Sequence, residues 1–151
     1  TSTLNLAVSL QDSGECAEAA AMLRTTLAVR TRTFGPDDKG TLTAEGHLAG
    51  ALLRLGEWAE AEAIGRATLE KRRHILGLDH RETLISAGDL AASLSKQGKH
   101  AEAAEMKREN FVSTTRLLGA EHEETLISVF NLAVSLSDYG STNDITRGKY
   151  F

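Results

Sequence analysis

Apolar residues recur at helical spacing along most of this chain. Within residues 41–82 the apolar positions that recur at helical spacing and form one helix face are Leu42, Leu48, Ala49, Leu52 and Leu55. This stripe predicts a helix from about Thr41 to Leu55. Gly56 supplies the left-handed turn that ends it.

A second helix is predicted from about Trp58 to Leu76. Its expected inward-facing residues are Ala61, Ile64, Leu69, Ile75 and Leu76. Gly77 ends this helix, and Asp79 with Glu82 has the spacing of a capping box for the next one. Glu121 and Glu124 form a weaker version one repeat later.

The same pattern returns every 42 residues. The series that keep this step are Gly14, Gly56, Gly98 and Gly140; Leu6-Ala7, Leu48-Ala49, Leu90-Ala91 and Leu132-Ala133; and Gly35, Gly77 and Gly119. Residues 41–82 and 83–124 are identical at 15 of 42 positions without a gap. A fixed period of this length indicates stacked supersecondary units, because one helix pair cannot bury its own apolar stripe.

The chain therefore holds about three and a half units. Their expected ranges are about 1–40, 41–82, 83–124 and a partial 125–140, followed by a divergent tail over 141–151. We expect an all-α fold, a right-handed α-solenoid of antiparallel helix pairs. Helices should cross closely where small residues repeat, at Ala7, Ala49, Ala91, Ala133, Ala19, Ala61 and Ala103.

Composition and charge exclude several classes of function. The net charge of −4 and the pI of about 5.7 leave no basic footprint for nucleic acid. The longest basic run, Lys71 to His74, suits the last turns of a helix. No apolar stretch approaches the ~20 residues that a membrane span needs. The single cysteine favours a reducing compartment, and we expect a cytoplasmic location.

No catalytic, metal or cofactor site is indicated. Cys16 shares a helix-start position with Trp58 and His100, which favours a structural thiol. His80 and His122 share one repeat position in the loop between units, which favours a structural role such as helix capping. We therefore expect no enzymatic activity, no metal and no cofactor.

The repeated motif resembles a known family. Its elements are Asn131-Leu132-Ala133, the glycine eight positions after that Leu, the Ala-Glu-Ala that begins the second helix of each unit, and the loop Leu76-Gly77-Leu78-Asp79-His80. Together they resemble the 42-residue tetratricopeptide variant of kinesin light chains, nephrocystin-like proteins and NB-ARC receptor-like proteins. The resemblance covers nearly the whole chain up to about Gly140.

The resemblance implies a concave groove, lined by the first helix of each unit, that takes an extended peptide or a helix. It places four residues at the groove position before the packing Leu-Ala pair: Asn5, His47, Asp89 and Asn131. Family members often use Asn there to hold a ligand's backbone. His47 and Asp89 depart from that pattern.

Further rows point toward the same groove. Gly46, Gly50 and Gly88 are glycines inside predicted helices, where glycine costs about 0.5–1 kcal/mol relative to alanine. Either a ligand approaches the backbone there, or neighbouring first helices pack closely. Arg54 and Lys96 place two cations in the centre of another row, and a ligand with an acidic residue or a solvated row of mixed charge both explain them.

We interpret the chain as a module that binds a protein or peptide partner in its groove, within a larger adaptor or receptor-like protein. No nucleic-acid or membrane partner is expected. Two alternatives remain open: a structural scaffold that self-assembles into homo-oligomers through its exposed ends, and a ligand-sensing regulatory domain of a larger protein.

Overall fold

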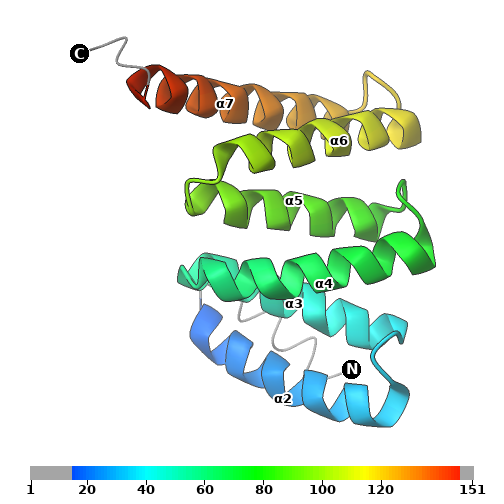
Figure 1. Cartoon of the computed structure of the whole chain (residues 1–151). Helices are drawn as coiled ribbons and strands as arrows, with labels where there is room; N and C mark the ends of the chain where they lie inside the picture. The colour runs from blue at the N-terminus through cyan, green and yellow to red at the C-terminus, as the bar shows by residue number, and fades with distance from the viewer. Residues whose placement is uncertain (1–14, 147–151) are drawn as a thin grey trace. The chain divides into compact units, whose positions relative to one another are not determined.

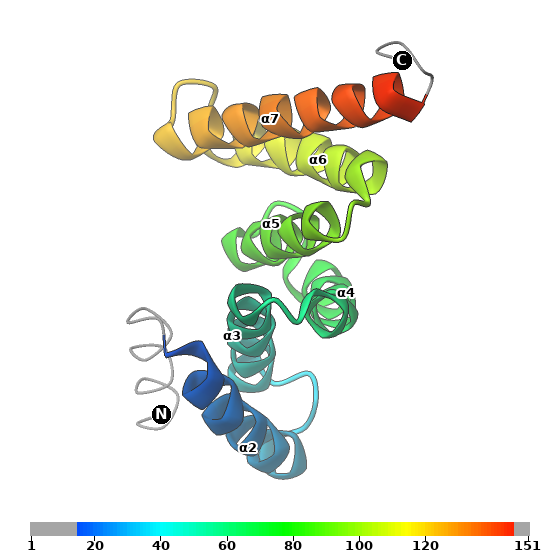
Figure 2. The same ribbon diagram turned by 90° about the vertical axis from the view of Figure 1, so that its left-hand side faces the viewer.

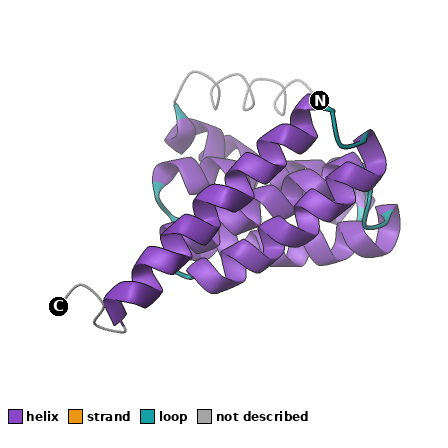
Figure 3. Ribbon diagram, turned by 90° about the horizontal axis from the view of Figure 1, so that it is seen from above, coloured by secondary structure: helices purple, strands orange, loops and turns teal. Residues whose placement is uncertain are grey.

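A computed structural model describes residues 15–146 of the chain, and every regular element among them is a helix (Figures 1 and 3). The helices are α2 (Cys16–Phe34), α3 (Lys39–Leu55), α4 (Trp58–Leu76), α5 (Arg81–Lys96), α6 (His100–Leu118) and α7 (Glu123–Thr146). The predicted all-α class is confirmed.

The chain forms two compact units, residues 1–75 and 76–151, and each is described by itself. In the first unit α2 packs against α3, and hydrogen bonds join α3 to α4. In the second unit α5 packs against α6, and α6 against α7 (Figure 2). Short connections of this kind make successive helices antiparallel neighbours.

The helix bounds follow the apolar pattern closely. Helix α4 spans the predicted residues, and α3 begins at Lys39, two residues before its predicted start. The core of the first unit is a cluster of small and branched side chains: Ala20, Leu23, Leu48, Ala51, Leu52 and Ala61. Ile75 was predicted to face inward, but it is 42% exposed near the end of α4. Leu55, the last residue of the apolar stripe on α3, is 41% exposed.

Repeated alanines fill the helix contacts. The described ones are fully or almost fully buried: Ala19, Ala49, Ala61, Ala91 and Ala103. Ala133 is the exception and is exposed on α7. Close approach of helices at the buried positions is therefore confirmed, since any larger side chain would overpack a dense interior.

The glycine series that includes Gly56, Gly98 and Gly140 was expected to end helices. Two of these glycines, Gly56 and Gly98, follow the end of a helix. Gly56 is left-handed, with φ 85° and ψ 8°, and its N–H donates to the carbonyls of Leu52 and Leu53. Gly98 also has a positive φ, of 79°. Gly140 instead lies inside α7, which continues to Thr146 past the expected repeat boundary. Gly14 lies outside the described residues.

The residues that cap the starts of α3, α5 and α7 occupy the same position of the repeat. Asp38 accepts hydrogen bonds from the backbone N–H groups of Gly40 (2.9 Å) and Thr41 (3.1 Å) at the start of α3. His80 and His122 stand 42 and 84 residues later, and the Nδ1 of each accepts from the N–H two residues on, at 3.2 Å. The suggested capping role of these histidines is confirmed.

The capping box predicted for Asp79 and Glu82 is wrong. Asp79 precedes the true cap by one residue, and its carboxylate instead accepts hydrogen bonds from Arg116 at 3.0 and 3.1 Å. The sequence spacing alone could not distinguish these arrangements, because an ion pair across 37 residues is invisible in a local motif.

Candidate functional site

The predicted groove residues of the first unit share one face of α3. Gly46, His47, Gly50 and Arg54 follow one another at intervals that keep a helix face. His47 and both glycines are half-buried, and Arg54 is exposed. A partner could therefore reach this face without displacing the core.

In the second unit the predicted residues lie on two helices. Gly88, Asp89 and Lys96 share a face of α5, where the first two are half-buried and Lys96 is exposed. Asn131 is exposed on α7. Asn5, at the equivalent position in the first repeat, lies outside the described residues, so the structure locates three of the four residues in this row.

The close neighbour of Gly46 is a side chain of the protein itself. A Cβ atom at this position would lie 3.2 Å from Nη2 and 3.3 Å from Nη1 of Arg72, which projects from α4. This differs from both explanations suggested by the sequence, a ligand or a neighbouring first helix. The glycine makes room for a guanidinium from the second helix of the same pair.

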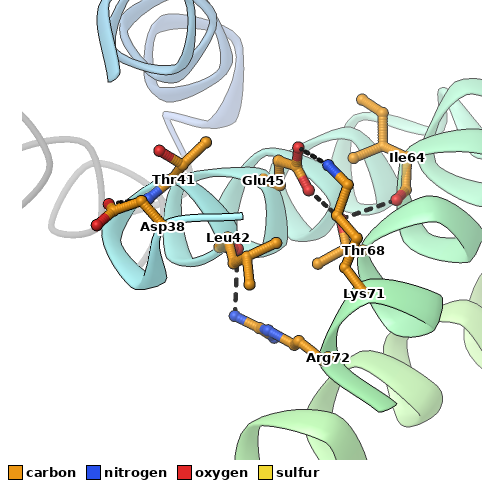
Figure 4. A network of polar contacts seen from close by, with 8 residues as sticks. All are labelled: Asp38, Thr41, Leu42, Glu45, Ile64, Thr68, Lys71 and Arg72. Carbon is orange, nitrogen blue, oxygen red and sulfur yellow. Dashed lines mark hydrogen bonds and ion pairs between the residues drawn. The ribbon is translucent and has the colours of Figure 1, made fainter. Parts of the chain in front are cut away.

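Arg72 makes one of the polar contacts that join α4 to α3 (Figure 4). Its side chain is only 3% exposed, and its Nη2 donates to the carbonyl oxygen of Leu42 at 3.2 Å. The methylene stem packs in the interior while the charged end finds acceptors, which is how arginine tolerates burial.

Glu45 makes a separate group of polar contacts between the same two helices (Figure 4). Its Oε1 pairs with Lys71 Nζ at 2.9 Å, and its Oε2 accepts a hydrogen bond from Thr68 Oγ1 at 2.9 Å. Thr68 is buried, and Lys71 is partly shielded. Three residues of α4 thus fix the helix against α3 beneath the predicted binding face.

Gly88 has a looser environment than Gly46. Among the described residues, an added Cβ would meet Asn110 Nδ2 of α6 at 3.7 Å, which is an ordinary contact. Its neighbour too belongs to the second helix of the same pair. The two glycines therefore face their own second helix, but only Gly46 is tightly confined.

A pocket of about 220 Å³ opens in the second unit. It lies between the start of α5, the last two turns of α6 and the start of α7. Its lining is mostly apolar, with an amide and two hydroxyls: Leu84, Ile85, Leu117, Leu118, Ile127, Asn110, Thr114 and Ser128, together with Arg81 and Glu124.

Two ion pairs join helices of the second unit, and one of them, between Arg81 and Glu124, lines the pocket. Arg81 Nη2 lies 3.0 Å from Glu124 Oε1, joining the starts of α5 and α7. Arg116 of α6 pairs with Asp79, also at 3.0 Å. All four side chains are at least one-third exposed, so solvent screens both pairs, and their main effect is to orient the helix starts.

The amine of Lys107, between α6 and α7, has a shifted pKa. Burial lowers the pKa of Lys107, and the nearby charge of Asp138 raises it by a smaller amount. The ammonium donates a hydrogen bond to the buried Ser135. Lys107 therefore stabilises the contact between α6 and α7.

Sequence reasoning missed one structural feature beneath the binding face, the buried arginine of α4. The basic run that contains Arg72 was interpreted as the charged end of a helix, and that holds for Arg73 and His74 at the end of α4. Burial of Arg72 was not foreseen. Its signal was available, because Arg30 occupies the same position one repeat earlier and is also largely shielded.

Residues 15–146 contain no cluster of candidate metal ligands. Among them no three His, Cys, Asp or Glu side chains gather in a way that could hold a metal ion. Cys16 is buried at the first position of α2, as its repeat position suggested. None of the described helices has the length and apolar character needed to cross a membrane.

Comparison with known proteins gives a consistent result. The tetratricopeptide repeat family model matches residues 1–70 and 40–109. No curated protein matches the chain. Among solved structures, kinesin light chain TPR-like repeats from Podosopora anserina are similar, with a TM-score of 0.86 and 24% identity over 95% of this chain and 68% of that one.

Two further structures extend the likeness. A variant of the same Podosopora anserina protein gives a TM-score of 0.85 at 24% identity, with the same coverage. A TPR-like protein from Chlorobium tepidum gives 0.67 at 21% identity, over 93% of this chain and 92% of that one. At these identities the likeness establishes the fold, an all-α array of paired helices.

Proposed function

Because the chain belongs to the tetratricopeptide repeat family, we propose that it binds a peptide or helix of a partner protein along the faces of its first helices. Tetratricopeptide arrays generally serve as protein–protein interaction modules, and repeat arrays offer extended concave surfaces for this purpose. The array would form part of a larger adaptor or receptor-like protein.

The observation that carries this proposal is one repeat position. His47, Asp89 and Asn131 occupy it on α3, α5 and α7, and each side chain is at least partly accessible to solvent. Their polar atoms can donate to or accept from a peptide backbone. Polar side chains at a fixed interval on rigid helices suit an extended ligand whose backbone groups also repeat.

Arg54 and Lys96 add a charge preference. Both are exposed near the ends of their helices, seven residues after His47 and Asp89 respectively. Cations on a binding face steer acidic partners and suppress basic ones. We therefore expect the partner segment to carry at least one acidic residue, and its affinity to fall as salt increases.

The test is a pull-down from a lysate of the source organism. The native chain is compared with a variant that carries alanine at Asn5, His47, Asp89 and Asn131 and glutamate at Arg54 and Lys96. Circular dichroism confirms that both fold. Support comes from a protein that the native chain captures and the variant loses, and whose binding segment then binds as a synthetic peptide.

A control variant keeps this comparison specific. It carries alanine at Glu18, Glu70 and Glu105, which are exposed on the second helices α2, α4 and α6. The control should retain the partner. If the control loses it while the first-helix variant keeps it, binding occurs on the second helices and the proposal is wrong.

A second function is favoured by one specific observation, the apolar surface of α7. Leu126, Phe130 and Val129 are 55%, 67% and 42% exposed. An exposed apolar surface of this kind can drive association between copies of the chain. The chain would then act as a self-assembling scaffold, and a molecular mass that rises with concentration would support this alternative.

A further inference from the structure

We propose that two copies of the chain pair through α7, side by side and antiparallel about a two-fold axis. The contact is a seam of residues at alternating intervals of four and three along α7: Leu126, Phe130, Ala133 and Ser137. This spacing keeps all four on one helix face. The inference rests on the self-assembly alternative and specifies its geometry, a pair that closes on itself.

The seam is open to solvent. Leu126 and Phe130 are 55% and 67% exposed, and Ala133 and Ser137 are exposed as well. The apolar residues that flank the seam are between 39% and 51% exposed: Ile127, Val129, Val134 and Leu136. A contiguous exposed apolar surface marks an interaction site in soluble proteins.

On α3 and α5 the same repeat position faces the second helix of its own pair. Gly46, which is equivalent to Phe130, lies close to Arg72 of α4, where an added Cβ would be 3.2 Å from Nη2. Gly88, the equivalent residue on α5, faces Asn110 of α6. In both pairs, therefore, the seam is where the second helix approaches the first.

Phe130 is incompatible with that arrangement. A phenyl ring extends well beyond Cβ and would enter the space that the second helix fills in the earlier pairs. The turn that brings a second helix back is also missing among the described residues, because α7 runs on through Gly140 to Thr146. Gly140 lacks the positive φ that Gly56 and Gly98 adopt. The α7 seam is therefore suited to a different occupant.

The seam is complementary in size to a second copy of itself. In an antiparallel pair, Phe130 of one copy lies opposite Ala133 of the other. Leu126 then lies opposite Ser137, because these two positions have the same midpoint on the helix. Each layer joins a large side chain to a small one, as in well-packed helix pairs. A parallel pair would instead place Phe130 against Phe130 and Ala133 against Ala133, a collision beside a void.

Charge supports the same occupant and orientation. Residues 125–137 hold no Asp, Glu, Lys, Arg or His, whereas the equivalent stretch of α3 holds Glu45 and His47. Two such uncharged faces can meet without burying a charge. The acidic residues Glu123 and Glu124 lie at the start of α7. Antiparallel pairing keeps the acidic starts of the two copies at opposite ends of the contact, where they repel each other least.

The contact is short, so the pair should be weak. From Leu126 to Ser137 the seam spans about three helical turns, roughly 16 Å. A pair of helix faces of this length buries less than the roughly 1,600 Å² of a standard protein interface. We expect a dissociation constant in the micromolar to millimolar range.

Sedimentation equilibrium over this concentration range is the first test. The mean mass should rise from the 16.2 kDa of one chain and level off at twice that value. Ala133→Lys places a cation against Phe130 of the other copy and should weaken the pair at least tenfold. Ala67→Lys, at an exposed alanine of α4, is the matched control and should pair like the native chain.

Cysteine cross-linking tests the orientation, in chains whose own Cys16 is replaced by alanine. Chains with Leu126→Cys and chains with Ser137→Cys should form a mixed disulfide when they are combined and oxidised, and neither should cross-link alone. In the antiparallel pair, equal positions lie roughly 16 Å apart along the axis. A disulfide needs Cα atoms within about 7 Å. Thermal unfolding establishes that each variant retains its fold.

The outcomes separate this inference from the functions proposed above. A mass that stays at one chain, or an Ala133→Lys chain that pairs as tightly as the native one, overturns the inference. A mass that passes two chains leaves self-assembly standing and overturns the closed pair. Cross-linking of each cysteine chain with itself shows a parallel contact and overturns the orientation. Peptide binding is tested separately by the pull-down.

Discussion

Arg72 shows how a single residue shapes the helix beside it. Its guanidinium is buried, bonds to the Leu42 carbonyl and occupies the space above Gly46. A buried cation must be well supplied with acceptors, since desolvation costs several kcal/mol. Glycine at position 46 is therefore explained by the protein's own packing.

The two helix glycines should respond differently to alanine. Gly88→Ala should stabilise the protein by about 0.5–1 kcal/mol, because alanine favours helix and the nearest atom is 3.7 Å away. Gly46→Ala should stabilise the protein less than Gly88→Ala does, or destabilise it, because the Arg72 guanidinium must move to make room for the new methyl group. Chemical denaturation measures both, and equal gains would contradict the packing account.

Removal of the arginine should be costly and coupled to Gly46. Arg72→Ala should destabilise by about 2–4 kcal/mol, from a charged hydrogen bond and a buried stem. In the Arg72→Ala protein, Gly46→Ala should give the full stabilisation that alanine brings to a helix. The coupling energy between the two substitutions should be at least about 0.5 kcal/mol. A double-mutant cycle measures this, and additivity would show that the two residues do not interact.

At the scale of helices, caps at a fixed repeat position define where each first helix begins. Asp38 accepts two backbone N–H groups and pairs with Arg30 Nη2 at 3.0 Å. The hydrogen bond from Arg30 is the main cause that lowers the pKa of Asp38, with the Thr41 N–H next. His80 and His122 accept only one backbone N–H each.

Acid should remove the contribution of Asp38. A carboxyl group with a lowered folded-state pKa stabilises above its unfolded value, near pH 3.9, and loses this contribution as pH falls through the folded value. Asp38→Asn should therefore lower the thermal midpoint at pH 7, and the gap should narrow below about pH 4. A gap that stays constant down to pH 2 would contradict this assignment.

The helices themselves could be predicted from sequence because their determinants are local. Apolar periodicity and terminal glycines gave α4 at its observed bounds and α3 within two residues. Contacts between residues far apart in the sequence could not be predicted from local patterns. Asp79 was taken as a cap since its partner Arg116 lies 37 residues away, and Gly140 was expected to mark a boundary that α7 passes through.

The candidate binding face was predictable only in part for the same reason. Repeat position identified His47, Asp89 and Asn131 as equivalent, and the structure leaves each accessible. The pocket near them requires side chains from three helices, which no one-dimensional spacing reveals. Whether these residues bind a partner stays a prediction.

At the scale of the whole molecule, α7 differs from the first helices before it. Leu126 and Leu136 are 55% and 39% exposed, whereas Leu42 and Leu52, their equivalents on α3, are 2% and 1% exposed. The repeat thus places on α7 an apolar face of the kind that complete helix pairs bury. Exposed faces of this type promote association.

We predict that the chain self-associates through α7. The average mass of the native chain should rise between micromolar and millimolar concentration, and Leu126→Gln with Phe130→Gln should suppress that rise. Val112→Gln, at an exposed apolar residue of α6, is the matched control and should not. Light scattering measures the masses, and a rise that the α7 variant retains would locate the contact elsewhere.

The central claim is that first-helix polar residues hold the partner, and titration calorimetry tests it most directly. The partner's binding segment is titrated into the native chain, into a triple alanine variant at His47, Asp89 and Asn131, and into the control with alanine at Glu18, Glu70 and Glu105. We predict a Kd at least tenfold weaker, about 1.4 kcal/mol, for the first-helix variant and an unchanged Kd for the control. An unchanged Kd for the first-helix variant would contradict the account.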